Sequence, residues 1–194
     1  MPGADPRAMS HSWLFTGPPG SGRSLAAIDF AAALMCTDPE EPGCGRCEAC
    51  RAVLDTKQHT DLVLVDPQEV IIPVDTVREV IGRAASLPTV APWRVVIFNN
   101  ADRLNNNGAN ALLKTVEEPP ARTVIIMCAP SDAPEDFSQT LRSRCRHLYI
   151  PSPSVESITA QLVSEGASDH DAHLAALTSL RHVGRARRLV NDPA

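Results

Sequence analysis

Residues 17–24 read Gly-Pro-Pro-Gly-Ser-Gly-Arg-Ser. It lies between the apolar run Trp13–Phe15 and the helical pattern Leu25–Met35, the position of a phosphate-binding loop between a strand and a helix. Glycines allow backbone N–H groups to wrap a phosphate, and the N-terminus of the following helix adds partial positive charge. The candidate phosphate-binding residues are Gly17, Gly20, Gly22, Arg23 and Ser24.

The chemistry of this loop is altered where a lysine usually contacts the β- and γ-phosphates. Arg23 stands there, and its planar guanidinium suits bidentate contacts, while Ser24 keeps a hydroxyl that can ligate magnesium. In phosphate-loop enzymes a later buried strand ends in an acid that holds magnesium. Here the run Arg94–Phe98 is followed by the amides Asn99 and Asn100. These changes argue against hydrolysis, and binding of ATP and Mg²⁺ without turnover stays open.

The composition limits the classes of protein to consider. A chain of 194 residues with 43% hydrophobic and 21% charged residues fits one globular core with a small appendage. No apolar run approaches the ~18 residues of a membrane span, so we expect no membrane partner. The first eleven residues lack the apolar core of a signal peptide, which predicts a cytoplasmic protein without disulfides. A net charge of −5 argues against a general nucleic-acid coat.

Short apolar runs alternate with stretches of helical spacing. The expected strands are Trp13–Phe15, Leu62–Val65, Val95–Phe98, Val124–Cys128 and Leu148–Ile150. The expected helices between them are Leu25–Met35, Val74–Ala85, Gly108–Glu117 and Pro134–Leu141. Strands that are apolar on both faces and alternate with helices indicate an α/β fold, in which helices sandwich a parallel sheet.

The strands stop after Pro151-Ser152-Pro153, and a helical region follows. The expected helices there are Val155–Val163, Ala172–Arg181 and Gly184–Val190, with Ser154 as the N-cap of the first. We therefore predict a leader over residues 1–11, an α/β domain over residues 12–150 and a small helical domain over residues 151–194.

Four cysteines form a compact pattern within residues 36–50. Cys36, Cys44, Cys47 and Cys50 follow the spacing C-x7-C-x2-C-x2-C. Four thiolates suit a tetrahedral zinc ion, and a site without an open coordination position is structural rather than catalytic. The alternative is four unrelated cytosolic cysteines.

The cysteine module is a poor candidate for a DNA-binding zinc finger. Arg46 is the single basic residue within residues 36–50, against Asp38, Glu40, Glu41 and Glu48, and this balance repels phosphate. The two other cysteines, which lie far away in the sequence, are expected in the core: Cys128 and Cys145.

The run Asn110–Pro120, followed by Ser143-Arg144-Cys145, resembles the bacterial clamp-loader subunits of DNA polymerase III, which are AAA+ proteins. The resemblance extends from about Ser12 to Asn191. The family contains γ/τ subunits, which hydrolyse ATP, and a related δ′ subunit with a degenerate nucleotide site. Arg23 and the pair Asn99-Asn100 place the chain with δ′, and its phosphate loop is similar to that of actinobacterial δ′ proteins.

The resemblance implies that Arg144 reaches the γ-phosphate held by a neighbouring γ/τ subunit and acts as an arginine finger. The alternative is an ion pair within the chain. The resemblance also implies a helical lid over residues 151–194, and it leads us to expect that the family's C-terminal collar is absent from this chain.

The function implied is that of a subunit of the DNA polymerase III holoenzyme, with no ATPase of its own. With γ/τ and δ as partners, it would help to load the sliding clamp on primed DNA during replication. The alternative is an active ATPase of the γ/τ type, in which Arg23 and Ser24 bind Mg-ATP and Asp102 replaces the missing acids.

Overall fold

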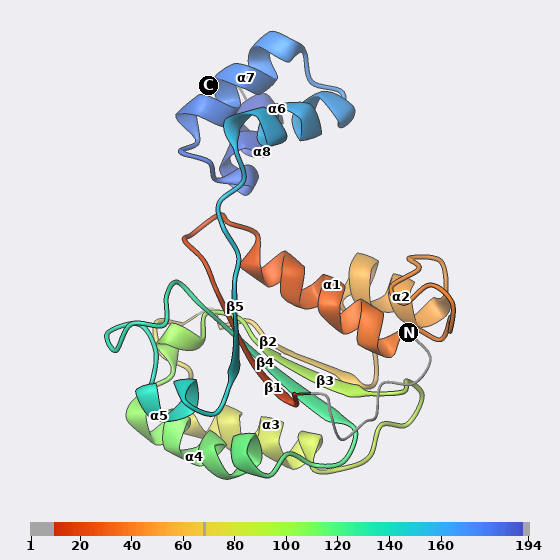
Figure 1. Ribbon diagram of the computed structural model, residues 1–194, viewed down its shortest axis with the longest axis vertical. Coiled ribbons are helices and arrows are strands. Elements are labelled where there is room, and N and C mark those ends of the chain that lie inside the picture. Colours follow the sequence, from red (N-terminus) through yellow and green to blue (C-terminus); the bar gives the residue numbers. More distant parts are fainter. Residues whose placement is uncertain (1–9, 68, 192–194) are drawn as a thin grey trace. The chain divides into compact units, whose positions relative to one another are not determined.

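The computed structural model describes residues 10–67 and 69–191 (Figure 1), and these residues form two compact units. The larger unit comprises the chain up to Thr16 and residues 24–148. The smaller unit comprises residues 17–23 and the chain from Tyr149 onward.

The larger unit is built on a five-stranded sheet with the order β2-β3-β4-β1-β5. The strands are β1 (Ser12–Thr16), β2 (Leu62–Val65), β3 (Arg94–Phe98), β4 (Thr123–Ala129) and β5 (Arg146–Tyr149). β1 pairs with β4, β4 with β3 and β3 with β2, all in parallel. Every residue of β3 and β4 is buried, as expected for central strands covered on both faces. The predicted α/β fold with a parallel sheet is therefore confirmed.

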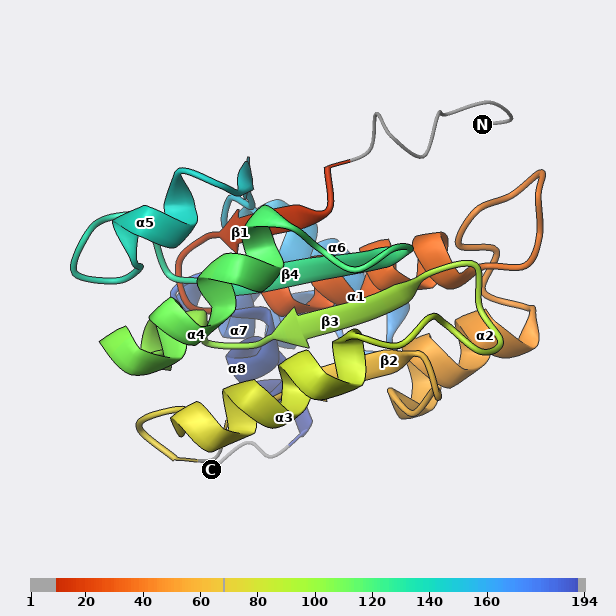
Figure 2. The same ribbon diagram turned by 90° about the horizontal axis from the view of Figure 1, so that it is seen from below.

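Helices cover both faces of this sheet (Figures 1 and 2). They are α1 (Arg23–Met35), α2 (Glu48–Arg51), α3 (Val74–Ala84), α4 (Asn106–Glu117) and α5 (Gln139–Arg142), with a π-helical segment at Ala52–Thr56 and a 3-10 turn at Ala101–Arg103. α1 and α2 pack on one face around Phe15, Ile97 and Ile126. α3 and α4 pack on the other face around Phe98 and Met127. Two hydrophobic cores thus enclose the sheet.

A buried ion pair joins the beginning of β2 to the beginning of β3. Asp61 is fully buried and accepts hydrogen bonds from the backbone N–H groups of Thr89, Val90 and Ala91 at 2.8–2.9 Å. Nη2 of Arg94 donates to the same carboxylate at 2.9 Å. Burial alone would raise the pKa of Asp61, but these hydrogen bonds hold it well below its usual range.

Two predicted elements of the larger unit are wrong in extent. The segment Pro134–Leu141 is helical only from Gln139, because Ser131 and Asp136 form a local turn instead: Oγ of Ser131 donates to Oδ2 of Asp136 and accepts from the N–H of Ala133. The last strand was expected at Leu148–Ile150, but β5 begins at Arg146 and is largely exposed, because an edge strand need not be apolar on both faces. Neither α2 nor the π-helical segment was predicted from the sequence.

The smaller unit contains three helices, α6 (Val155–Ser164), α7 (Asp169–Thr178) and α8 (Val183–Asn191). They bury Ile158, Leu162 and several alanines in a core of their own. Ser154 caps α6 as predicted, since its side chain accepts from the N–H of Ser157. α7 begins three residues before the expected Ala172 because Ser168 caps it.

Candidate functional site

The phosphate-binding loop keeps the backbone conformation that its glycines allow. Gly20 and Gly22 have φ angles of 85° and 89°, in the region that favours glycine. A Cβ atom at Gly20 would lie 2.5 Å from Cγ of His182, and one at Gly17 would lie 2.2 Å from the carbonyl oxygen of Ile150. The loop is therefore packed closely within the smaller unit, and side chains larger than hydrogen are excluded at both positions.

The cation of the loop is bound to the loop itself. Nη1 of Arg23 donates to the carbonyl oxygen of Gly17 at 2.8 Å. The buried hydroxyl of Ser21 has no hydrogen-bond partner among the described residues. Ser24 lies in the first turn of α1 and is partly buried. The hydroxyl of Ser21 is thus buried and unpaired among the described residues, and the guanidinium of Arg23 already has an internal acceptor.

The amides expected at the end of β3 lie directly after that strand. The N–H of Asn99 donates to the carbonyl oxygen of Val65 at 2.9 Å, which fixes the backbone at this point. The side-chain Oδ1 of Asn99 is buried and has no partner within the described chain. Asn100 has a left-handed backbone (φ 51°), and Asp102 is exposed in the 3-10 turn that follows. The amides of Asn99 and Asn100 can accept or donate hydrogen bonds, but they cannot act as a general base.

Arg144 lies between α5 and β5, and two motifs that are far apart in the sequence meet there. Its Nε contacts Oε1 of Glu117 at 2.5 Å, and its Nη1 donates to the carbonyl oxygen of Thr140 at 2.8 Å and to Oγ of Ser143 at 3.1 Å. The side chain of Arg144 is 36% exposed and that of Glu117 is 46% exposed. Sequence reasoning left an intramolecular ion pair open as the alternative, and the structure contains one. It did not identify Glu117, because no pattern links residues 27 positions apart.

The two neighbouring arginines also have internal partners. Nε of Arg142 donates to Oδ2 of Asp132 at 3.0 Å. The guanidinium of Arg146 lies 5.1 Å from the ring centroid of Trp13, a cation–π contact. The Arg142–Asp132 pair is about as exposed as the Arg144–Glu117 pair.

The four cysteines of the module are brought together. The Sγ atoms of Cys36, Cys44, Cys47 and Cys50 all lie within 4.8 Å of one another. Cys36 Sγ is 3.6 Å from Cys44 Sγ and 3.9 Å from Cys47 Sγ. Zinc–sulfur bonds of about 2.3 Å in a tetrahedron place the sulfurs about 3.8 Å apart. The donor set and its spacing fit a metal ion that prefers four thiolates.

Backbone groups support the thiols as a ligand set. The N–H of Cys47 points to Cys44 Sγ and the N–H of Cys50 points to Cys47 Sγ, each at 3.4 Å, and such contacts stabilise thiolates. Hydrogen bonding from the backbone of Thr37 lowers the pKa of the Cys47 thiol to about 6, whereas burial raises the pKa of Cys50 to about 12. Cys128 and Cys145 lie in the two cores, as predicted.

Known structures with this fold include a DNA polymerase III γ subunit-related protein and a branch migration motor. A DNA polymerase III γ subunit-related protein from Thermotoga maritima superposes with a TM-score of 0.64 at 19% identity, over 97% of this chain and 57% of that one. The RuvB Holliday junction branch migration motor of the same organism gives a TM-score of 0.58 at 17% identity, over 95% of this chain and 55% of that one. At these identities the likeness defines the fold alone.

The chain belongs to the family described as DNA polymerase III, delta subunit, whose model matches residues 4–154. Curated relatives include the δ′ subunit of Pseudomonas aeruginosa, 35% identical over 81% of this chain and 49% of that protein. The δ′ subunit of Escherichia coli is 34% identical over 86% of this chain and 50% of that protein. The γ/τ subunit of Mycobacterium tuberculosis is 33% identical over 87% of this chain and 30% of that protein. The resemblance to clamp-loader subunits is thus confirmed.

This chain spans about half the length of the δ′ relatives that it matches. Among the described residues, no helix has the length and apolar character needed to cross a bilayer.

Proposed function

We propose that this chain is the AAA+ part of a δ′-type clamp-loader subunit, which contributes Arg144 to the ATP site of a neighbouring γ/τ subunit. In this role it assembles with γ/τ and δ in the cytoplasm and helps to load the sliding clamp on primed DNA during replication. The family assignment and the δ′ relatives support the clamp-loader role. The single observation that carries the arginine-finger role is the exposure of Arg144, whose side chain stays 36% exposed although it is paired with Glu117.

An exposed ion pair is well suited to hold such an arginine until a neighbour arrives. Pairs of this kind contribute only about 0–1 kcal/mol to stability. A phosphate can therefore replace the carboxylate at little cost in free energy. Glu117 and the carbonyl oxygen of Thr140 fix the direction of the guanidinium, which reduces the entropy lost when it meets phosphate. Glu117 is therefore a positioning residue for Arg144 in this proposal.

The phosphate-binding loop of this chain serves as a scaffold in the proposed role and does not support hydrolysis. Arg23 is bonded to the carbonyl of Gly17, and the positions after β3 carry Asn99 and Asn100 instead of carboxylates. ATP hydrolysis requires a group that orients the attacking water and an acid that holds magnesium. The alternative of an active ATPase is weaker, because Asp102 is exposed in a surface turn. If nucleotide binds, the residues that would hold it are Gly17, Gly20, Gly22, Arg23, Ser24, Asn99 and Asn100.

The remaining parts have structural roles in this proposal. Zinc held by the four-cysteine cluster orders residues 36–50 and supplies no open coordination position for chemistry. α6, α7 and α8 form the lid of the AAA+ module. The proposed domains are the α/β domain at residues 12–150 and the lid at residues 151–194.

The test is the DNA-stimulated ATPase rate of a loader assembled from γ/τ, δ and the protein that carries this chain. Arg144→Ala should lower the rate steeply, since arginine fingers contribute roughly 10³–10⁵ in rate in well-studied phosphoryl transfers. Arg78→Ala is the matched control, because Arg78 is also exposed and paired with a carboxylate. An unchanged rate for the Arg144 variant, in a loader that assembles normally, would remove the finger role.

A further inference from the structure

β2 is an edge strand of the sheet, and part of its main chain is open to pairing. The sheet order places β3 on one side of β2 and no strand on the other within the described chain. The N–H groups of Val95 and Asn99 donate to the carbonyl oxygens of Asp61 and Val65. In a parallel ladder the intervening residues then direct their polar groups away from the partner. The N–H and C=O of Leu64 consequently face the open edge.

The strand carries none of the usual protections against edge pairing. β2 reads Leu-Val-Leu-Val, without lysine, proline or a bulge. Natural edge strands commonly use such residues to block added strands. An unprotected apolar edge therefore suggests a docking surface rather than a passive boundary.

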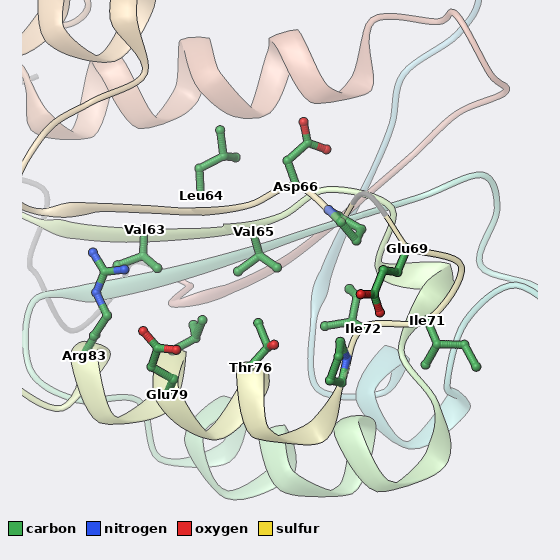
Figure 3. Close-up of a pocket in the computed structure, with 13 residues that line it drawn as sticks. Val63, Leu64, Val65, Asp66, Glu69, Ile71, Ile72, Thr76, Glu79 and Arg83 are labelled. Atoms are coloured by element: carbon green, nitrogen blue, oxygen red, sulfur yellow. The ribbon is translucent and has the colours of Figure 1, made fainter.

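A groove lies beside β2 on the side of α3 (Figure 3). It has a volume of ≈ 380 Å³, and its walls include Val63, Val65 and Ile72 on one side and Thr76 and Glu79 on the other. Figure 3 shows Val63 and Val65 pointing toward α3, whereas Leu64 points to the opposite face. A strand added beside β2 would direct every second side chain into this groove, because successive side chains alternate between faces.

A second hollow receives the alternate side chains. It has a volume of ≈ 490 Å³ and is lined by residues that include Leu62, Leu64, His59 and Lys57. Main-chain pairing that gives affinity, with pockets for alternate side chains that give specificity, is the general mode of strand addition. The edge of β2 has both parts.

The rim of the groove is held in place by Arg103. Its Nη1 donates to the carbonyl oxygens of Pro67 at 3.0 Å and Glu69 at 2.9 Å. The N–H of Ile72 donates to the carbonyl oxygen of Arg103 at 2.9 Å, and Ile72 forms a bridge with Leu104. These contacts within the chain hold the rim in one arrangement, which lowers the ordering cost of binding.

The charge of the groove defines the chemistry of its occupant. Glu69 and Glu79 contribute carboxylates to its lining, and neither forms an ion pair with another described residue. Figure 3 shows the carboxylate of Asp66 on the opposite face, as for Leu64, and Arg83 at the other end of the groove. Two unpaired carboxylates beside an apolar floor favour a side chain that combines an apolar stem with a positive charge.

We propose that the edge of β2 binds an extended, basic segment of a partner protein, which adds a strand beside Leu64 and places an apolar side chain and a lysine or arginine in the groove. This site is separate from Arg144 and from the phosphate-binding loop, and it does not depend on their roles.

The experiment uses synthetic fluorescein-labelled peptides with the 194-residue chain, and measures binding by anisotropy. The probe peptide reads Thr-Val-Thr-Lys-Thr-Val-Thr-Ser, so that valine and lysine share one face. Replacing its lysine by glutamate should weaken binding at least tenfold. In an extended peptide, the N–H groups of alternate residues point to opposite edges. N-methylation of the residues whose N–H groups face β2 should abolish binding, whereas N-methylation of the residues whose N–H groups face away should change the affinity by less than threefold. Hydrogen exchange should show new protection of the Leu64 amide in the complex.

The protein variants separate this site from general charge attraction. Glu69→Lys combined with Glu79→Lys should weaken binding of the probe peptide at least tenfold. Glu135 is also an exposed acid but lies outside the groove, and Glu135→Lys should have no effect on binding. The proposal would be overturned if N-methylation did not affect binding, if no binding occurred at millimolar peptide, or if the Leu64 amide gained no protection from exchange. A dimer that protects Leu64 without peptide would assign the edge to a second copy of the chain and would also overturn it.

Discussion

At the scale of single residues, the carboxylate of Asp61 is fully buried in the larger unit and is surrounded by hydrogen-bond donors. Three backbone N–H groups and the guanidinium of Arg94 surround its carboxylate. Nη1 of Arg94 also donates to the carbonyl oxygens of Arg83 and Ser86. This one ion pair therefore joins the starts of β2 and β3 to the end of α3. Its contribution to stability depends on the presence of both partners.

Asp61→Asn should destabilise the larger unit by about 3–5 kcal/mol, because it leaves the buried guanidinium of Arg94 without a counter-charge. The measurement is the midpoint of urea unfolding followed by circular dichroism. Asp75→Asn is the matched control: Asp75 also pairs with an arginine, but the pair is exposed and should contribute about 0–1 kcal/mol. Equal effects of the two substitutions would contradict this assignment.

The same carboxylate sets a dependence of stability on pH. The pKa of Asp61 is lower in the folded protein than its unfolded value of about 3.9. The unfolded chain therefore binds a proton more readily than the folded one, and the stabilisation is complete above about pH 5. It is lost as the pH falls through the unfolded value toward the folded one. The unfolding free energy of the Asp61→Asn variant should consequently fall less between pH 5 and pH 3 than that of the parent, as measured by urea titrations at each pH.

Glu117 is the residue through which the proposed arginine finger can be weakened without being removed. Glu117→Gln should lower the DNA-stimulated ATPase rate of the assembled loader by about 5–50-fold, less than Arg144→Ala, because the guanidinium loses its fixed direction. Glu117→Asp should recover part of the rate. Glu118→Gln, which changes the adjacent exposed acid, should leave the rate unchanged. A rate that is insensitive to Glu117 while Arg144→Ala remains inactive would show that the ion pair does not position the finger.

At the scale of elements, the sequence predicted the helices and strands that have a regular apolar pattern. It missed the segments whose structure depends on local hydrogen bonds. β2 was predicted with its observed bounds, and the central strands were placed to within a residue, because their apolar runs are unbroken. α5 was predicted too long because Ser131 and Asp136 form a turn before it. The π-helical segment after α2 follows no side-chain period that a sequence reveals. The pairs Asp61–Arg94 and Arg144–Glu117 depend on tertiary contacts and could not be predicted from spacing.

The four-cysteine cluster is the element for which the sequence was most specific, because two C-x2-C steps place three of the four ligands close together in the sequence. We predict one zinc ion per chain by elemental analysis of protein purified without added metal. Cys47→Ser should abolish zinc retention and lower the unfolding midpoint, since metal binding contributes to folding free energy. Cys128→Ser, a buried cysteine outside the cluster, should retain one zinc ion. Full zinc retention by the Cys47 variant would exclude the four-thiolate site.

At the scale of the whole molecule, an AAA+ fold is combined with an altered nucleotide site and an exposed arginine. Hydrolysis and finger functions have different requirements, since hydrolysis needs acids beside the phosphate-binding loop and a finger needs only a directed guanidinium at the surface. In the proposed function, Asn99 and Asn100 stand where hydrolysis would need acids, and Arg144 supplies the directed guanidinium. The fold would then serve through its geometry, without turnover of its own.

This division predicts that the chain alone hydrolyses ATP at no more than the background rate, with or without primed DNA. Phosphate release from the purified 194-residue chain is the measurement, and the Arg23→Ala variant is the control for contaminating ATPases, because it alters the loop cation that is bound to Gly17. Turnover that is present in the parent and lost in Arg23→Ala would contradict the prediction and favour an active ATPase. In that case Asp102→Asn should also abolish turnover, since Asp102 is the acid that would have to replace the missing carboxylates. If turnover is absent, the proposed role of Arg144 is tested separately, in the loader assembled with the protein that carries this chain.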